Sequence, residues 1–457
     1  MAAHERFQFE SIAEIRGKID VLGVPIDLSE DISPLLRLVR IGRHTAPNAL
    51  AVLPMEGCDS NLDGSPSELV ERRYLRLAGG GAGLLWWEAC AVAEEGKAND
   101  LQMVMNESNA GRFETLLKKA NAEAARRNGA CHRPVHVLQL THSGRYSRPL
   151  GHKPIPIAPQ HDPFLDPRVG LAADAPLATD AYLDDLIGKY ARTAYLAREA
   201  GFDGVDIKAC HRYLLSELLA SRARKGKYGG CFENRTRLLS DAIGAVRREA
   251  GDGLFVACRF NVFDAHPYPY GFGVDEKDPW LFDPAEPMAL VRLLIAKGVE
   301  LLSNSAGNPY SVHPQVTRPF DYSSSGVPVP DEHPLESVAR LFAFTRMIQR
   351  EAGSVPVVGN GYSWLRQYLP YAGAANIASG ACALVGLGRS SFAYPDAPRD
   401  IRRTGAMDPP KCCVSCSRCT QIMRDHGRTG CVIRDADVYG PLYARYREEA
   451  LAREGSH

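Results

Sequence analysis

The stretch Ala200-Gly-Phe-Asp-Gly-Val-Asp-Ile207 decides the fold, because it places a short apolar strand directly after a helical pattern at 181–199. The same helix–strand unit recurs along the chain. Strand-like apolar runs occur at 50–54, 83–87, 134–140, 204–207, 254–260, 299–302, 355–358 and 381–385. Short, continuously apolar strands are typical of a parallel sheet that is covered by helices. Eight such units predict a (β/α)8 TIM barrel, an α/β fold, with a doubly wound sheet as the alternative.

Helical patterns separate these runs and supply the other half of each unit. They lie at 68–77, 109–127, 181–199, 234–249, 284–297, 336–351 and 365–379. Two of the expected loops are long, at 144–179 and 305–333. Long loops in a compact domain are usually functional or disordered, and in a barrel both would lie over the carboxyl ends of the strands.

The composition is that of a globular protein with a large core. The chain has 457 residues, of which 45% are apolar and 24% are charged. Lys+Arg and Asp+Glu are equal at 54 each, which does not favour a nucleic-acid partner or a membrane surface. We find neither a membrane-spanning run nor the apolar core of a signal peptide. Twelve cysteines in such a chain indicate a reducing, cytoplasmic compartment.

A second informative stretch lies near the C-terminus, where Cys413-Val-Ser-Cys416-Ser-Arg-Cys419 is followed by Cys431. Three thiols at a period of three on one loop, with a remote fourth, are typical of an iron–sulfur cluster. A four-cysteine zinc site is the alternative, although zinc more often uses two separated C-x2-C pairs. The adjacent Cys412 is an alternative first ligand.

Polar side chains follow the predicted strands at the place where a barrel carries its active site. Lys208, His211 and Tyr213 come after the fourth strand, and this cation, imidazole and phenol are able to clamp an anion or a carbonyl and to supply a proton. Core packing is the alternative for Tyr213, and a surface position is the alternative for Lys208. Arg259 closes the fifth strand, where a buried charge needs an anionic ring system, a phosphate or a carboxylate as its partner.

Glycines mark the ends of the last two strands. Asn360-Gly361 follows the seventh strand, and Gly386-Leu-Gly388-Arg389 follows the eighth. Glycine lets backbone N–H groups approach a phosphate closely, and barrels often bind phosphate in the loops after strands seven and eight.

Together these segments resemble the Old Yellow Enzyme superfamily of FMN-dependent barrels, over about 36–394. The motifs stand in family order: Pro54-Met55, Q-L-x-H-x-G-R at 139–145, A-G-F-D-G-V-D-I at 200–207, H-x-Y-L at 211–214, Y-G-G-x-x-E-N-R at 228–235 and G-R-S-S-F at 388–392. The cysteine loop is similar to that of the iron–sulfur branch, which includes 2,4-dienoyl-CoA reductase and trimethylamine dehydrogenase.

The resemblance implies FMN at the barrel mouth and a [4Fe-4S] cluster beside it. The implied flavin contacts are Pro54, Met55 and Ala89 along the ring, Gln139 and Arg259 at the pyrimidine edge, and Asn360, Gly361, Gly388 and Arg389 at the phosphate. The implied cluster ligands are Cys413, Cys416, Cys419 and Cys431. Tyr213 matches the proton donor of ene-reductases, and His211 matches one of two groups that hold the substrate carbonyl. Lys208 stands at the other position, where histidine is common, and this leaves the substrate class open.

We expect three parts: an N-terminal extension at 1–35, the FMN barrel at 36–396, and a cluster segment with a helical tail at 397–457. The iron–sulfur relatives continue into a dinucleotide-binding domain, which we do not expect on this chain. The expected reaction is reduction of an activated C=C bond in an enone or enoyl thioester, with electrons reaching FMN through the cluster from an external donor protein. An amine or N-methyl dehydrogenase, which a cationic Lys208 disfavours, and a non-enzymatic electron-transfer subunit are the alternatives. The substrate, the donor and assembly into a homo-oligomer stay open.

Overall fold

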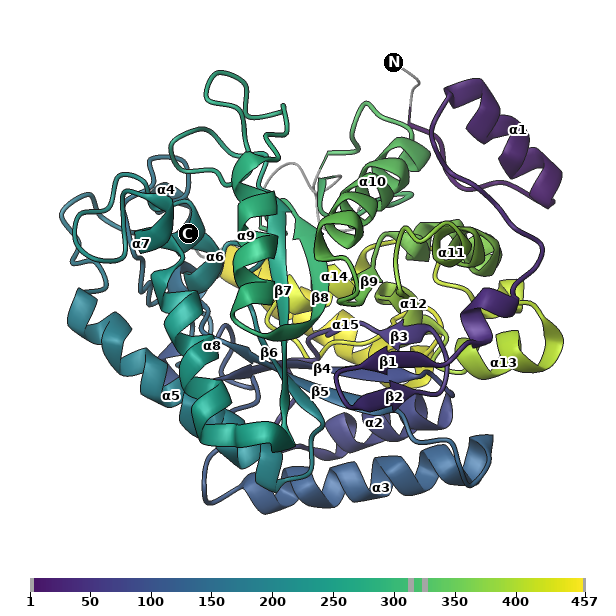
Figure 1. Ribbon diagram of the computed structural model, residues 1–457, viewed down its shortest axis with the longest axis horizontal. Coiled ribbons are helices and arrows are strands. Elements are labelled where there is room, and N and C mark those ends of the chain that lie inside the picture. The colour runs from purple at the N-terminus through teal and green to yellow at the C-terminus, as the bar shows by residue number, and fades with distance from the viewer. Residues whose placement is uncertain (1–3, 311–315, 323–327, 455–457) are drawn as a thin grey trace.

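The centre of the protein is the predicted barrel, as a computed structural model that describes residues 4–310, 316–322 and 328–454 shows (Figure 1). Eight parallel strands close in the order β10-β3-β4-β5-β6-β7-β8-β9. Their bounds are β3 Leu50–Val52, β4 Leu84–Ala91, β5 Val135–Thr141, β6 Gly204–Ile207, β7 Phe255–Phe263, β8 Val299–Ala306, β9 Val357–Gly359 and β10 Leu384–Leu387. Each strand overlaps one predicted apolar run, so the (β/α)8 prediction is confirmed.

Helices surround the strands on the outside (Figure 1). They are α2 Glu68–Gly79, α3 Ala110–Asn128, α5 Asp180–Glu199, α8 Arg237–Ala250, α9 Ala285–Ala296, α10 Pro334–Ala352 and α11 Leu369–Ala378. Each presents an apolar stripe at helical spacing; in α5, Leu183, Leu186 and Tyr190 are buried. Two predicted helices are interrupted: Thr236 separates α7 (Phe232–Arg235) from α8, and a 3-10 turn at Tyr362–Tyr368 precedes α11.

Two elements near the N-terminus were not predicted. Helix α1 (Ile12–Leu22) buries Ile15 and Ile19 in a core that it shares with α10 and α11. A hairpin of β1 (Val39–Ile41) and β2 (His44–Ala46) adds Ile41 and Ala46 to the apolar core inside the barrel. The strands of the hairpin are three residues long, too short for a periodic pattern to show in the sequence.

The C-terminal segment packs along the barrel and is coloured yellow-green to yellow in Figure 1. It contains α12 (Arg389–Ala393), α13 (Ala397–Thr404), α14 (Arg418–Arg424) and α15 (Ala436–Glu454), and the last of these confirms the predicted tail helix. The Thr429 N–H donates to the Gly57 carbonyl at 2.7 Å, and Asp435 accepts from Arg72 of α2 at 2.7 Å. The cysteine loop is therefore held against the strand ends. No helix among the described residues is long and apolar enough to cross a membrane.

Candidate active site

A cavity of about 1020 Å3, measured with its open mouth, lies at the carboxyl ends of the barrel strands. Because those ends meet at one rim, residues far apart in the sequence converge there. The cavity is lined by Leu53, Pro54, Met55, Glu56, His211, Tyr213, Arg259, Ser305, Pro309, Tyr310, Thr317, Arg318, Pro319, Asn360, Gly361, Ser363, Gly388, Arg389, Thr420 and Met423.

The cavity brings together most of the residues that the sequence selected. Nine of them line it: Pro54, Met55, His211, Tyr213, Arg259, Asn360, Gly361, Gly388 and Arg389. Three predicted residues are not part of the lining. The Gln139 amide donates to Asp206 at 2.6 Å, Ala89 is buried in β4, and the Lys208 ammonium bonds Glu56. The flavin contacts expected of Ala89 and Gln139 stay predictions.

Three arginines of this cavity, Arg259, Arg318 and Arg389, form what we call the arginine wall. Among the described residues, no carboxylate forms an ion pair with any of them. Each also leaves a buried guanidinium nitrogen without a partner: Nε of Arg259 and of Arg318, and Nη1 of Arg389. Burial, and then the neighbouring guanidinium of Arg389, lower the pKa of Arg318. Buried, mutually repelling cations require an anionic ligand, so this donor set fits a phosphate and an anionic ring edge.

The loops after β9 and β10 complete the same rim. Gly361 has φ 94°, a left-handed conformation that favours glycine, and an added Cβ there would approach Leu341 to 3.0 Å. The Asn360 amide donates to the Asn304 carbonyl at 2.5 Å. Hydroxyl groups of Ser363 and Ser390 lie 3.2 Å apart beside them. These small and polar groups leave room for a ligand next to Arg389.

The same cavity also carries two phenols, Tyr213 and Tyr310, which we call the tyrosine wall. Their hydroxyl groups are hydrogen-bonded at 2.9 Å, and the ring of Tyr310 stacks on that of Tyr146 at 4.2 Å. Burial, and then the Glu56 carboxylate, raise the pKa of Tyr213 well above its usual value. Tyr213 therefore holds its proton at neutral pH, as a general acid must.

Lys208 lies behind the tyrosine wall instead of facing the cavity. Its Nζ is 2.7 Å from Glu56 Oε1 and 4.1 Å from the centre of the Tyr213 ring. The Lys208 side chain is 1% exposed and that of Glu56 is 14% exposed, so the carboxylate is the member of the pair that a ligand meets. Burial, then Arg259 and Lys208, lower the pKa of His211 well below its usual value, which keeps this imidazole neutral.

Several lining residues were not selected from the sequence. Glu56 directly follows the Pro54-Met55 motif, so the strand-end rule that selected Lys208 would also have found it. Arg318 lies in a long loop and does not directly follow a predicted strand, so that rule does not select it. Thr420 and Met423 belong to α14 of the cysteine segment, and only its docking on the barrel brings them to the cavity.

The four predicted cluster cysteines surround a second, smaller cavity of about 350 Å3. Cys413, Cys416, Cys419 and Cys431 all line it, whereas the Cys412 thiol instead bonds the Asp408 carbonyl at 3.5 Å. Arg389 lines both this cavity and the larger one. Within the described residues, no three His, Cys, Asp or Glu side chains are placed to hold a single metal ion. The four thiols are the groups that could serve as ligands of a multinuclear centre.

Comparison with known protein families assigns the chain to one of them. Residues 34–273 match the model of the NADH:flavin oxidoreductase / NADH oxidase family. The chain belongs to this family. It is 30% identical over 289 residues to an NADPH dehydrogenase of Listeria monocytogenes serotype 4b, across 62% of this chain and 77% of that protein. The protein is therefore an oxidoreductase, and FMN is the cofactor expected in its family.

Solved structures share the fold of this oxidoreductase. A complex of 2-naphthoyl-CoA reductase aligns with a TM-score of 0.68 and 19% identity, over 88% of this chain and 57% of that one. The 6-hydroxypseudooxynicotine amine oxidase of Pseudomonas geniculata N1 aligns with a TM-score of 0.65 and 22% identity, over 90% and 56%. The present chain thus spans somewhat more than half of each of these two proteins.

Proposed function

We propose that this oxidoreductase binds FMN in the large cavity and reduces an activated C=C bond in an enone or enoyl thioester. The observation that carries the proposal is a protonated phenol, Tyr213, that lines the same cavity as three arginines, each with a buried nitrogen that has no partner among the described residues. FMN, when bound, supplies the hydride chemistry. The chain itself must hold the cofactor, hold the substrate and deliver a proton.

The arginine wall would hold the anionic parts of FMN. Arg259 suits the pyrimidine edge, and Arg389 suits the phosphate, as the family resemblance implies. Arg318 joins Arg389 as a second phosphate ligand, because both have an unpartnered buried nitrogen. Asn360, Gly361 and Gly388 would surround the same phosphate. Pro54 and Met55, at the end of β3, would contact the ring.

The tyrosine wall would deliver the proton. Tyr213 gives its hydroxyl proton to the substrate α-carbon and becomes a phenolate, which then takes a proton from Tyr310, 2.9 Å away, and ultimately from water. The Lys208 ammonium, 4.1 Å from the ring of Tyr213, stabilises that phenolate. The neutral imidazole of His211 would donate a hydrogen bond to the substrate carbonyl.

The four cysteines would hold a [4Fe-4S] cluster that carries single electrons to FMN from an external donor protein. A reducing compartment such as the cytoplasm suits such a centre. The name of the Listeria relative, NADPH dehydrogenase, makes a nicotinamide the competing source of electrons. Stopped-flow mixing with NADH or NADPH decides this point: flavin bleaching at catalytic rates with either nucleotide alone would contradict the external donor.

The proposed reaction is tested by anaerobic flavin reoxidation. Protein with photoreduced flavin is mixed with cyclohexenone and, separately, with crotonyl-CoA, and the oxidised flavin absorbance is followed. Reoxidation by either compound with formation of the saturated product supports the proposal. Failure with both, in protein that reoxidises with an artificial electron acceptor, would indicate an electron-transfer subunit instead.

Amine oxidation is a second candidate that one observation favours. Lys208 and Glu56 compensate each other's charge, and the carboxylate is the more exposed member of the pair, on the cavity lining beside Tyr213 and Tyr310. A carboxylate next to aromatic rings is a suitable environment for an ammonium group. In this case, oxidised flavin would bleach on addition of an amine, the opposite change from that expected with enones.

A further inference from the structure

The turn that delivers Tyr213 to the cavity has an unusual backbone. His211 and Arg212 have φ of 65° and 59°, both in the left-handed region that non-glycine residues rarely adopt. Tyr213 follows at once, at the residue before α6 (Leu214–Leu219). A change in the dihedral angles of these two residues would move the phenol, so the turn needs something to hold it.

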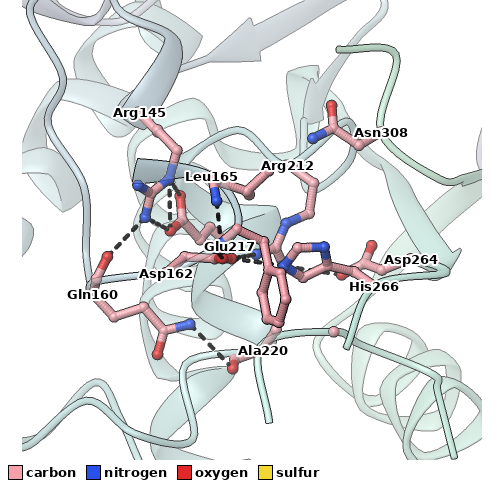
Figure 2. A network of polar contacts seen from close by, with 12 residues as sticks. Arg145, Gln160, Asp162, Leu165, Arg212, Glu217, Ala220, Asp264, His266 and Asn308 are labelled. Atoms are coloured by element: carbon pink, nitrogen blue, oxygen red, sulfur yellow. Dashed lines mark hydrogen bonds and ion pairs between the residues drawn. The ribbon is translucent and has the colours of Figure 1, made fainter. Parts of the chain in front are cut away.

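The Arg212 side chain provides an anchor, as Figure 2 shows. Its guanidinium lies between two carboxylates, with Nη1 3.0 Å from Asp264 Oδ2 and Nη2 3.2 Å from Asp162 Oδ2. The side chain of Arg212 is 1% exposed and both carboxylates are fully buried. Asp162 belongs to the long loop after β5 and Asp264 to the loop after β7, so Arg212 ties three loops of the rim together.

Asp264 also holds His211, through Asn261. The backbone N–H of His211 donates to Asn261 Oδ1 at 3.1 Å, and the Asn261 amide donates to Asp264 Oδ1 at 2.7 Å. Asp264 therefore fixes both left-handed residues, one through a side chain and one through the main chain. His266 adds a contact of 2.8 Å between its Nε2 and Asp162 Oδ2.

A separate ion pair holds α6 itself. Glu217 of α6 pairs with Arg145, as Figure 2 shows, and the Arg145 guanidinium also contacts Asp166. The first turn of α6 is thus fixed between two buried arginines. Neither Arg145 nor Arg212 is on the cavity lining, so neither meets a ligand directly.

We propose that Arg212 is a positioning residue for the proposed reaction, and that its ion pairs with Asp162 and Asp264 hold the left-handed turn that aims Tyr213 at the substrate. The inference rests on the proposed function for its chemical consequence. Displacement of a proton donor by about 1 Å is expected to slow the reaction about a hundredfold. The reaction rate should therefore depend strongly on the conformation of this turn.

A double-mutant cycle of Arg212→Ala and Tyr213→Phe tests this role. We expect Arg212→Ala to slow enone-dependent flavin reoxidation by about 10- to 100-fold with little change in the dissociation constant of FMN. If Arg212 acts through Tyr213, the double variant should be no slower than Tyr213→Phe alone. Additive losses would overturn the proposal, since they would show that Arg212 acts by general destabilisation. A wild-type rate in Tyr213→Phe would instead contradict the proposed acid.

Two further variants separate backbone strain from the ion pairs. Arg212→Gly keeps the left-handed turn free of strain but removes the ion pairs of the guanidinium with both carboxylates, whereas Arg212→Lys keeps one charge. We expect Lys to rescue part of the rate and Gly not to rescue it; full activity in Arg212→Gly would overturn the role of the ion pairs. Arg366→Ala is the matched control, because Arg366 also has a positive φ of 48° and pairs with a buried aspartate, Asp321. Any loss of the flavin reoxidation rate caused by Arg366→Ala should add to the loss caused by Tyr213→Phe.

A structural measurement needs no turnover at all. In a crystal structure of Arg212→Lys or Arg212→Gly, the Tyr213 hydroxyl should be displaced from its 2.9 Å contact with Tyr310. If the phenol keeps its place in both variants, the proposal is wrong whatever the enzyme reduces. If the phenol moves but no enone reoxidises the flavin, the positioning role stands and the proposed reaction fails.

Discussion

The two walls of the large cavity differ in whether their buried cations have carboxylate partners. On the arginine wall, Arg259, Arg318 and Arg389 lack a carboxylate partner among the described residues. Behind the tyrosine wall two buried cations have one: Lys208 pairs with Glu56, and Arg212 with Asp162 and Asp264. Both sets of cations are largely buried, so both must be compensated.

The difference distinguishes ligand binding from scaffolding. A buried cation that pairs with its own protein fixes the backbone around it, and removing it leaves an uncompensated carboxylate. A buried cation without a partner destabilises the ligand-free protein and favours the binding of an anion. Under the proposed function, the unpaired arginines would hold the cofactor, and the paired ones would fix the part of the rim that carries Tyr213.

Removal of the Tyr213 hydroxyl should have the largest effect on the reaction. We expect Tyr213→Phe to slow enone-dependent flavin reoxidation by about 10²- to 10⁴-fold, the usual contribution of a positioned proton donor. FMN affinity, which depends on the other wall, should stay the same. The two quantities are measured by stopped-flow absorbance and by fluorescence titration of apoprotein with FMN. A loss of FMN affinity would mean that the two walls are not independent; an unchanged rate would make Tyr310 the next candidate.

Breaking a scaffolding pair should instead show as lost stability. Arg145 is fully buried between Glu217 and Asp166, and we expect Arg145→Met to lower the free energy of unfolding by about 3–5 kcal/mol. Urea unfolding of FMN-free protein measures this value. Arg389→Met is the matched control: it removes a buried cation of the same size that has no carboxylate partner, so the stability of the FMN-free protein should not fall. Equal losses in both variants would refute the distinction between paired and unpaired arginines.

Loss of an unpaired arginine should weaken cofactor binding. A hydrogen bond to a charged group contributes about 1.5–3 kcal/mol, so Arg389→Ala and Arg318→Ala should each raise the dissociation constant of FMN by about 10- to 100-fold. Riboflavin, which lacks the phosphate, provides the control, and its affinity should change little in either variant. If riboflavin binding fell as much as FMN binding, the two arginines would not be phosphate ligands.

The sequence predicted the barrel and much of this rim for a physical reason. Apolar runs identify strands, and parallel strands bring whatever follows them to one edge, so Tyr213, Arg259 and Arg389 could be placed together without a structure. The direction of Lys208 could not be predicted, because it depends on a carboxylate 152 positions away in the chain. Arg318 was missed because its place depends on a residue far along the chain: its guanidinium donates to the Thr420 hydroxyl at 3.2 Å. The pairing state of each arginine, which separates the two walls, is a tertiary property.

The smallest effect concerns the link between the cavity and the cysteines. Cys416→Ser should lose the cluster iron and sulfide but keep the barrel, whose eight strands lie outside the cysteine loop. FMN should be retained with an affinity lowered by only a few-fold, since α14 contributes Thr420 and Met423 to the cavity and Arg389 lines both cavities. Iron and sulfide analysis of anaerobically purified protein, with FMN titration, measures both.

Cys412→Ser is the matched control and should keep its iron, because Cys412 does not line the small cavity. Zinc in place of iron would refute the cluster. Complete loss of FMN in Cys416→Ser would show that the arginine wall depends on the cysteine segment for its shape.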